Sequence, residues 1–217
     1  MQYSLPDLPY GYGDLEPHVS ARVLELHHGK HHKAYVEGAN RALEQLRTAR
    51  EQGDFTHIAA LERALAFNVS GHVLHSLFWQ NLSPDGGGEP EAALGDAIGR
   101  DFGSCDLLRQ QMNKAAESVM GSGWAALVWE PVSGRLLTAQ LHDHESNTLQ
   151  GSTPLLVFDA WEHAYYLQYL NEKAKFFEAL WNVVNWQDVA ARFDAAQEQQ
   201  AWQSGPAPEE RGRTLHG

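Results

Sequence analysis

The first eighty residues repeat apolar positions every three or four residues, which predicts two amphipathic helices. The first helix begins near Ser20, and the second runs from about Thr56 to Gln80. The polar stretch 47–56 between them is short enough for an antiparallel hairpin. The predicted buried face of the first helix consists of Leu24, His28, His31, Tyr35, Ala39, Leu43 and Leu46. That of the second consists of Ile58, Leu61, Leu65, Val69, His72, His75 or Ser76, and Trp79.

A boundary follows at "NLSPDGGGEPEAAL" (81–94), where three glycines lie between two prolines. Beyond it the pattern predicts two helices, three strands and a closing helical region, at 90–102, 105–119, 123–131, 135–143, 154–161 and 162–200. We therefore expect an α+β protein. A helical-hairpin domain (1–86) precedes a domain with a small three-stranded antiparallel sheet flanked by helices (87–202), and a disordered tail (203–217) ends the chain.

Composition narrows the class of protein. The 217 residues are 43% apolar and 20% charged, and the longest apolar runs are too short to cross a bilayer. The N-terminal stretch does not resemble a secretion signal, so we expect a cytoplasmic protein. The single cysteine, Cys105, excludes an internal disulfide and a multi-thiolate metal site. A net charge of −12 argues against nucleic acid or an anionic membrane as partner.

The stretch "LELHHGKHHKAYV" (24–36) contains four of the twelve histidines. On a helix His27, His31 and Tyr35 share one face, and His28 and His32 lie about 100° further round. Gly29 inside this helix costs about 1 kcal/mol relative to alanine, which indicates a kink or the close approach of another backbone. These residues alone leave two interpretations open, core histidines bonded to protein groups or a metal site.

Two further segments add candidate ligands. His72 and His75 fall on the apolar face of the second helix, and "FDAWEHAYY" places Asp159 at a strand end with His163 four residues later. An N-cap aspartate beside a structural histidine is the simpler interpretation of that pair. Taken together, three imidazoles and one carboxylate without a thiolate predict a buried mononuclear site between the two domains. Such a donor set suits manganese or iron, with zinc possible.

The segments "HHGKHHKAYV", "GHVLHSLFW", "GSGWAALVW" and "DAWEHAYYLQYLN", with "WNVVNW" at 181–186, occur in one order over residues 1–200. The chain thereby resembles the iron/manganese superoxide dismutases. The resemblance implies dismutation of superoxide at one Mn or Fe ion per subunit, held by His27, His75, Asp159 and His163.

The resemblance also implies roles for the surrounding residues. Tyr35 and His31 would gate the substrate funnel and relay protons, and an aromatic wall would consist of Trp79, Trp124 and Trp161. The protein would be a homodimer or tetramer, in which Glu162 reaches His163 of the partner subunit and Tyr166 pairs with the partner's His31.

Two departures from the family pattern concern the groups around the metal. The family holds a glutamine against the metal-bound solvent from one of two places, which here are Gly71 and a loop where His144 aligns, with His142 the weaker candidate. A histidine there resembles a subgroup that uses iron, manganese or either. Lys173 stands near the place where many members have an arginine. It could steer superoxide against the net charge together with Lys30 and Lys33.

Other metal proteins fit less well. A carboxylate-bridged di-iron protein needs two Glu-x-x-His pairs, and only Glu25 and His28 form one. The His-Glu-x-x-His motif of zinc hydrolases is absent, and zinc is redox-inert. A non-enzymatic metal-storage protein is the remaining alternative.

Overall fold

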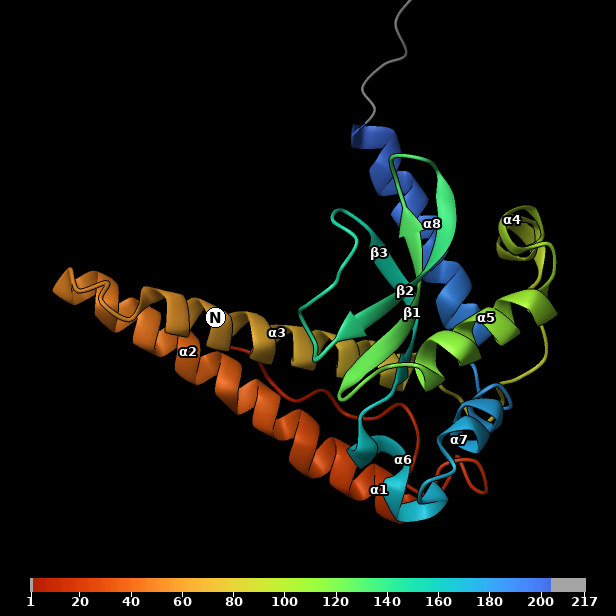
Figure 1. Cartoon of the computed structure of the whole chain (residues 1–217), viewed down its shortest axis with the longest axis horizontal. Coiled ribbons are helices and arrows are strands. Elements are labelled where there is room, and N and C mark those ends of the chain that lie inside the picture. The colour runs from red at the N-terminus through yellow and green to blue at the C-terminus, as the bar shows by residue number, and fades with distance from the viewer. Residues whose placement is uncertain (1, 204–217) are drawn as a thin grey trace, which may run out of the picture.

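The computed structural model describes residues 2–203, so the predicted disordered tail lies outside the described residues apart from Gln203. A helical hairpin is followed by a sheet with helices around it, and the hairpin projects from the sheet as one long arm (Figure 1). This arrangement confirms the predicted α+β class. Within the described residues no helix is long and apolar enough to cross a membrane.

The first rod of the hairpin consists of three consecutive pieces. They are α1 (Ala21–Leu26), a π-helical segment η1 (His27–His32) and α2 (Lys33–Gln52). The Ser20 side chain accepts a hydrogen bond from the Val23 N–H and caps the start of α1. The rod ends at Gly53, whose φ of +66° is the left-handed conformation that glycine adopts freely.

The predicted link 47–56 was too long, because residues 47–52 belong to α2. Arg47 forms ion pairs with Glu44 and Glu51 along the helix, at spacings that stabilise a polar helical surface. The second helix, α3, spans Ile58–Gln80. Its predicted inward positions Leu61, Leu65 and Val69 are only half-buried, and full burial begins at Gly71, where α3 reaches the sheet.

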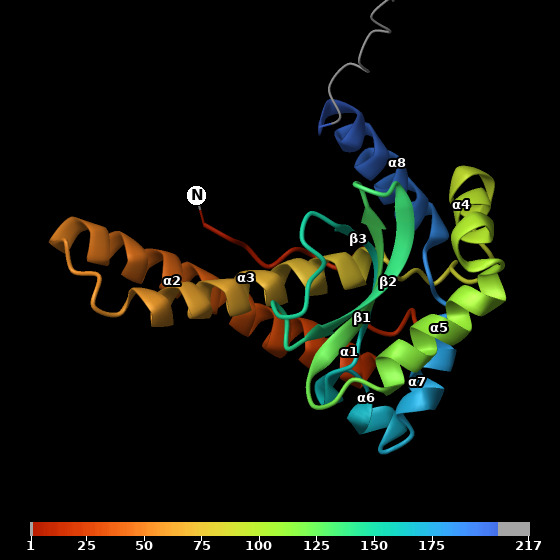
Figure 2. The same cartoon turned by 45° about the horizontal axis from the view of Figure 1, so that its top comes forward.

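The sheet has three antiparallel strands in the order β2-β1-β3. They are β1 (Gly123–Glu130), β2 (Arg135–His142) and β3 (Thr153–Asp159), within one or two residues of the predicted bounds. The central strand β1 is buried from Gly123 to Trp129 because both faces are covered, which explains its continuous apolar sequence. Helices α4 (Ala92–Phe102) and α5 (Cys105–Glu117) contact β2, while α3 contacts β3 (Figure 2).

One side chain at the end of α3 forms hydrogen bonds with the free edge of β3. Asn81 is fully buried, and its amide oxygen accepts a hydrogen bond from the Val157 N–H at 3.0 Å. Its amide nitrogen donates to the Leu155 carbonyl at 3.0 Å and to Asp188 at 2.8 Å. The Asn81 amide thereby satisfies two backbone groups that an edge strand would otherwise leave unpaired, and it ties the hairpin to the sheet.

The closing helical region predicted for 162–200 is divided into three helices. They are α6 (Glu162–Tyr169), α7 (Lys173–Leu180) and α8 (Trp186–Gln203). The first break falls at Leu170, whose φ of +51° is incompatible with a continuing right-handed helix. The apolar face of α7 packs Phe176 and Phe177 into the same core as β1 and β3, so all the elements around the sheet share one interior.

Candidate metal centre

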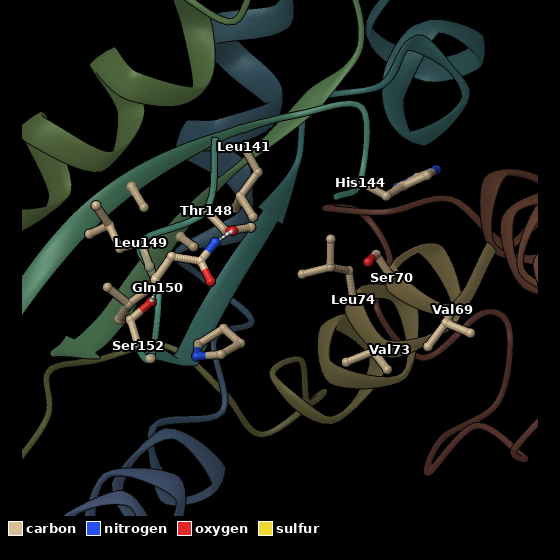
Figure 3. A pocket seen from close by; sticks show the side chains of 15 residues that line it. Val69, Ser70, Val73, Leu74, Leu141, His144, Thr148, Leu149, Gln150 and Ser152 are labelled. Atoms are coloured by element: carbon tan, nitrogen blue, oxygen red, sulfur yellow. Dashed lines mark hydrogen bonds between the residues drawn. The ribbon is translucent and has the colours of Figure 1, made fainter. Parts of the chain in front are cut away.

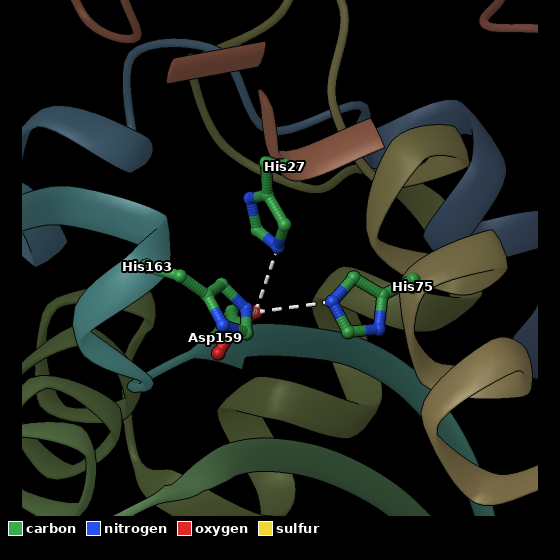
Figure 4. Close-up of side chains that lie close together, drawn as sticks. All are labelled: His27, His75, Asp159 and His163. Carbon is green, nitrogen blue, oxygen red and sulfur yellow. Dashed lines mark hydrogen bonds and ion pairs between the residues drawn. The ribbon is translucent and has the colours of Figure 1, made fainter. Parts of the chain in front are cut away.

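Four side chains from four different elements converge where the hairpin meets the sheet (Figure 4). They come from η1, α3, the last residue of β3 and the start of α6, and they are His27, His75, Asp159 and His163. One donor atom from each lies within 4.8 Å of all the others. The Asp159 Oδ2 atom is 2.9 Å from His27 Nε2, 3.1 Å from His163 Nε2 and 3.6 Å from His75 Nε2.

The local backbone directs each donor inward. At Asp159 the second carboxylate oxygen, Oδ1, accepts a hydrogen bond from the Trp161 N–H at 2.9 Å, which leaves Oδ2 for the histidines. At His75 the ring Nδ1–H donates to the Gly71 carbonyl one turn earlier at 2.6 Å. Because a carbonyl only accepts, His75 carries its proton on Nδ1, and the Nε2 lone pair faces the cluster.

The four histidines of the opening run have four different environments. His27 joins the cluster, and the His28 Nε2–H donates to the Pro6 carbonyl at 2.8 Å. His31 is half-buried and stacks on His163 with ring centroids 4.3 Å apart, while His32 bonds to His72 at 2.8 Å. Residues 27–32 form a π-helical turn, a local widening that occurs mostly at functional sites.

The irregularity predicted at Gly29 is therefore a π turn. No neighbouring atom lies within 4 Å of the Cβ that a larger residue would add there, so the alternative of a close backbone approach was wrong.

The electrostatics of the cluster favour a bound cation. Burial lowers the pKa of His27 to about 4 and that of His75 well below the usual value, so both imidazoles are neutral. Burial alone would raise the pKa of Asp159, but the charge of His163 and hydrogen bonds from His163 and His27 hold it well below its usual range. Neutral imidazoles and an ionised carboxylate are the forms in which these side chains bind metals.

The His75 Nε2 atom provides the test of fit. It is buried and has no hydrogen-bond partner among the described residues. A buried polar atom without a partner is costly, and a cation bound by His75, His27, His163 and Asp159 removes that cost. The donor set contains nitrogen and oxygen but no thiolate, which fits manganese or iron.

Comparisons with known proteins agree with this geometry. The model of the alpha-hairpin domain of iron/manganese superoxide dismutases matches residues 2–83, and the model of their C-terminal domain matches residues 90–192. The chain belongs to the iron/manganese superoxide dismutase family. The family assignment and the fold that the sequence predicts are therefore confirmed.

Curated members of the family are similar over most of their length. A superoxide dismutase named for Mn/Fe from Propionibacterium freudenreichii subsp. shermanii is 53% identical over 196 residues, covering 89% of this chain and 98% of the relative. One named for Fe from Mycobacterium tuberculosis is 52% identical over 91% of this chain and 96% of the relative. One named for Mn from Nocardia asteroides is 53% identical over 90% and 94%. Family members at equal identity thus carry different metals in their names.

The two places from which family members are expected to supply a glutamine lie side by side here. A Cβ added to Gly71 would lie 3.3 Å from the His144 ring and 2.9 Å from the Tyr35 ring. The His144 Nδ1 accepts a hydrogen bond from the Trp124 N–H at 3.0 Å, so His144 carries its proton on Nε2. That N–H is buried and has no partner among the described residues, and burial lowers the pKa of His144 to about 4.

Aromatic rings surround the cluster in this member of the family. Trp79 lies 4.8 Å from His27, Trp124 lies 5.0 Å from His75 and Trp161 lies 5.4 Å from His163, measured between ring centroids. Tyr35 lies 5.1 Å from His75. Phe67 also contacts both His144 and Tyr35. The sequence did not predict this neighbour, because Phe67 falls outside the predicted buried face of its helix.

The remaining candidates lie further out. Glu162 and Tyr166 are exposed on α6, and Lys30 and Lys33 are exposed on the first rod. Lys173 is half-buried, and its Nζ donates to the Val119 carbonyl at 3.4 Å.

A separate cavity of about 290 Å³ lies between α3, the sheet and the loop that leads into β3 (Figure 3). Its lining is mostly apolar and includes Val73, Leu74 and Leu149. His144 lies at its margin, and its ring nitrogen-bearing end points away from the other labelled side chains. None of the four proposed ligands lines this cavity among the residues that the structure describes, and His144 lies at the margin of both the cavity and the candidate metal centre.

Proposed function

We propose that this chain is a superoxide dismutase, which converts two superoxide anions and two protons to dioxygen and hydrogen peroxide. One manganese or iron ion would be held by His27, His75, Asp159 and His163. The observation that carries the proposal is the convergence of three imidazole nitrogens and one carboxylate oxygen within 4.8 Å, with the lone pair of a buried His75 nitrogen left unpaired.

A manganese or iron ion held by these residues would supply the redox chemistry, because both metals exchange single electrons. The chain supplies the binding site and the protons. Asp159 brings one negative charge into a buried site, which offsets part of the charge of the cation and lowers the cost of holding it there.

Proton delivery falls to Tyr35 and His31. Burial, with the negative charges of Asp159 and Asp143, raises the pKa of Tyr35 well above its usual value, so its phenol is protonated and available as a hydrogen-bond donor. His31 is half-buried and stacks on His163, which supports a position on the path between solvent and the metal centre.

His144 adds a second donor toward the centre. Its Nε2–H is fixed in place by the hydrogen bond from Trp124 to Nδ1 and by stacking on Trp161 at 4.6 Å. A neutral, oriented N–H beside the four ligands would tune the potential of an ion held there. The surrounding tryptophans would exclude bulk water, which strengthens each of these interactions.

Electrostatic steering would bring superoxide to the site against the net charge of −12. Lys30, Lys33 and Lys173 are the cations assigned to it. Burial lowers the pKa of Lys173, which is consistent with a position partly withdrawn from solvent.

The quaternary structure would be a homodimer or a pair of dimers joined through α6. Leu167 on this helix and Leu170 just after its end are 63% and 59% exposed, and Glu162 and Tyr166 on the helix are exposed as well. Apolar side chains this exposed beside a candidate active site support an interface there. Glu162 would then reach His163 of the partner subunit, and Tyr166 the partner's His31.

The decisive experiment separates catalysis from storage. The purified protein is loaded with manganese or iron in separate preparations, and metal content is measured beside superoxide consumption. We expect one ion per chain and turnover with at least one metal, and loss of both in His75→Ala and Asp159→Ala. His57→Ala, at an exposed histidine on the hairpin tip, is the control and should match the parent protein. Stoichiometric metal without turnover in both preparations would instead establish a storage protein.

A further inference from the structure

Two further histidines, His32 and His72, lie next to the candidate metal centre. His32 is fully buried, and its Nε2 atom is 2.8 Å from Nδ1 of His72 on α3. The other ring nitrogen of His32, Nδ1, is 2.9 Å from Nε1 of Trp79. Trp79, His32 and His72 thus form one continuous row of hydrogen bonds, which we call the Trp79–His72 row.

The indole of Trp79 fixes the direction of every hydrogen bond in the row. An indole N–H can only donate, so the His32 Nδ1 must accept and His32 must carry its proton on Nε2. That N–H then donates to the His72 Nδ1, which leaves the proton of His72 on its own Nε2. Burial lowers the pKa of His32 to about 3, in agreement with a neutral ring.

A row that starts at an indole cannot transport protons. Trp79 has no lone pair to receive a proton and does not release the one it has, so the row has a fixed polarity from one end to the other. Its effect must therefore be geometric, because hydrogen bonds at both nitrogens lock the orientation of the His32 ring.

The locked rings contact two of the proposed metal ligands. His32 stacks on His75 with centroids 5.4 Å apart and 22° between the planes. Trp79 meets His27 edge to face with centroids 4.8 Å apart. The row therefore packs directly against the rings of His27 and His75.

We propose that His72 is a positioning residue of the metal centre, whose Nδ1 anchors the row and through His32 holds the His75 ring at its binding angle. The inference rests on the proposed metal-binding function. His72 itself lies outside the cluster, half-buried beside Ser4 and Arg192 at a surface hollow and touched by the edge of the Tyr3 ring at 5.3 Å.

Two nearly isosteric substitutions isolate the acceptor atom. In His72→Asn the amide oxygen can occupy the place of Nδ1 and still accept from His32, whereas His72→Leu fills similar space without an acceptor. Val73→Ala is the control, because Val73 is the exposed neighbour of His72 on α3 and contributes no atom to the row. Ser76 is unsuitable, since its hydroxyl oxygen lies 3.5 Å from His32 Nε2 and 3.4 Å from His72 Nδ1.

The readouts are the rate at which the manganese-loaded protein loses its metal to a chelator and the visible absorption band of the trivalent form. In His72→Leu we expect release about 10-fold faster and a shifted band, since groups that orient metal ligands change affinity by about that factor. His72→Asn and Val73→Ala should stay close to the parent protein on both measurements. A role in folding alone would lower the melting temperature of His72→Leu without moving the band.

Equal release rates and bands in the Leu and Asn variants, whether changed or unchanged, would overturn the proposal, because the acceptor would then be irrelevant. A neutron structure of the manganese-loaded parent protein tests it independently of any variant's folding. It must show deuterium on Nε2 of both His32 and His72, and deuterium on either Nδ1 would overturn the proposal. Metal uptake and release do not depend on turnover, so absence of dismutase activity would refute the proposed function and leave this test valid.

Discussion

Gly71 offers the sharpest test of how tightly the candidate metal centre is packed. It lies inside α3, where replacing glycine by alanine normally stabilises a protein by about 1 kcal/mol through the helix propensity of alanine. At Gly71 the added methyl would lie 2.9 Å from two carbons of the Tyr35 ring and 3.3 Å from the His144 ring. Both distances are shorter than ordinary van der Waals contact, so at least one of these side chains must move.

The two effects oppose each other, and their magnitudes decide the result. Overpacking a well-packed interior costs about 1–3 kcal/mol, which equals or exceeds the gain of about 1 kcal/mol from helix propensity. We expect Gly71→Ala to be at best neutral and at worst about 2 kcal/mol less stable than the parent protein. We also expect lower activity, since Tyr35 is the proposed proton donor.

Gly99→Ala is the matched control, because Gly99 is exposed in α4 and nothing lies within 4 Å of its added Cβ. That variant should gain about 1 kcal/mol with unchanged activity. Urea unfolding and superoxide consumption are measured for both variants at equal metal content. If Gly71→Ala gains as much stability as Gly99→Ala and keeps full activity, the Tyr35 ring is not tightly packed against this turn of α3, and the prediction is refuted.

Three further predictions concern stability and approach of the substrate. The pKa of the Asp101 carboxyl is lowered chiefly by its hydrogen bond with Arg100, and its Oδ2 atom accepts a hydrogen bond from the Leu136 N–H at 2.8 Å. The ionised Asp101 therefore stabilises the folded protein above about pH 4, and this stabilisation is lost as the pH falls through the folded-state pKa. Asp101→Asn should lower the free energy of unfolding in urea by about 1–2 kcal/mol at pH 7 and should leave it unchanged in acid. Asn81→Ala should cost at least about 3 kcal/mol, because it leaves buried backbone groups of β3 unpaired; a loss below 1 kcal/mol would contradict that role. Superoxide consumption should fall as ionic strength rises, and should fall less in a variant in which Lys30, Lys33 and Lys173 are neutralised. A parent rate that does not depend on salt would rule out electrostatic steering.

Much of the fold followed from periodicity. Strands β1 and β2 were predicted within a residue or so, because their burial produces long apolar runs between turn residues. The hairpin was predicted from its three- and four-residue spacing. The length of α2 was not, since a polar helix end held by ion pairs looks like a loop in a hydrophobic pattern. The end of α6 also escaped prediction, because the chain turns there through a positive φ at Leu170, where no glycine marks the turn in the sequence.

Some features of the candidate site could likewise be predicted from the sequence, and others could not. The resemblance to the iron/manganese superoxide dismutases implied that His27, His75, Asp159 and His163 would meet, and the structure places them together. Helical spacing alone left open which histidines of each helix take part. The sequence did not predict the Trp79–His72 row. The direction of a hydrogen bond between imidazoles depends on which ring nitrogen faces which neighbour, and no spacing along the chain encodes that.

The four converging side chains are distributed unevenly along the chain. Two lie before residue 80 and two after residue 158, and the carboxylate that gives the cluster its charge is among the later pair. A growing polypeptide therefore contains its histidine-rich hairpin long before it has the acidic residue that would make this a site for a cation. The hairpin alone offers two imidazoles of this cluster and no carboxylate, and the four-residue donor set is complete only once residue 163 has been synthesised.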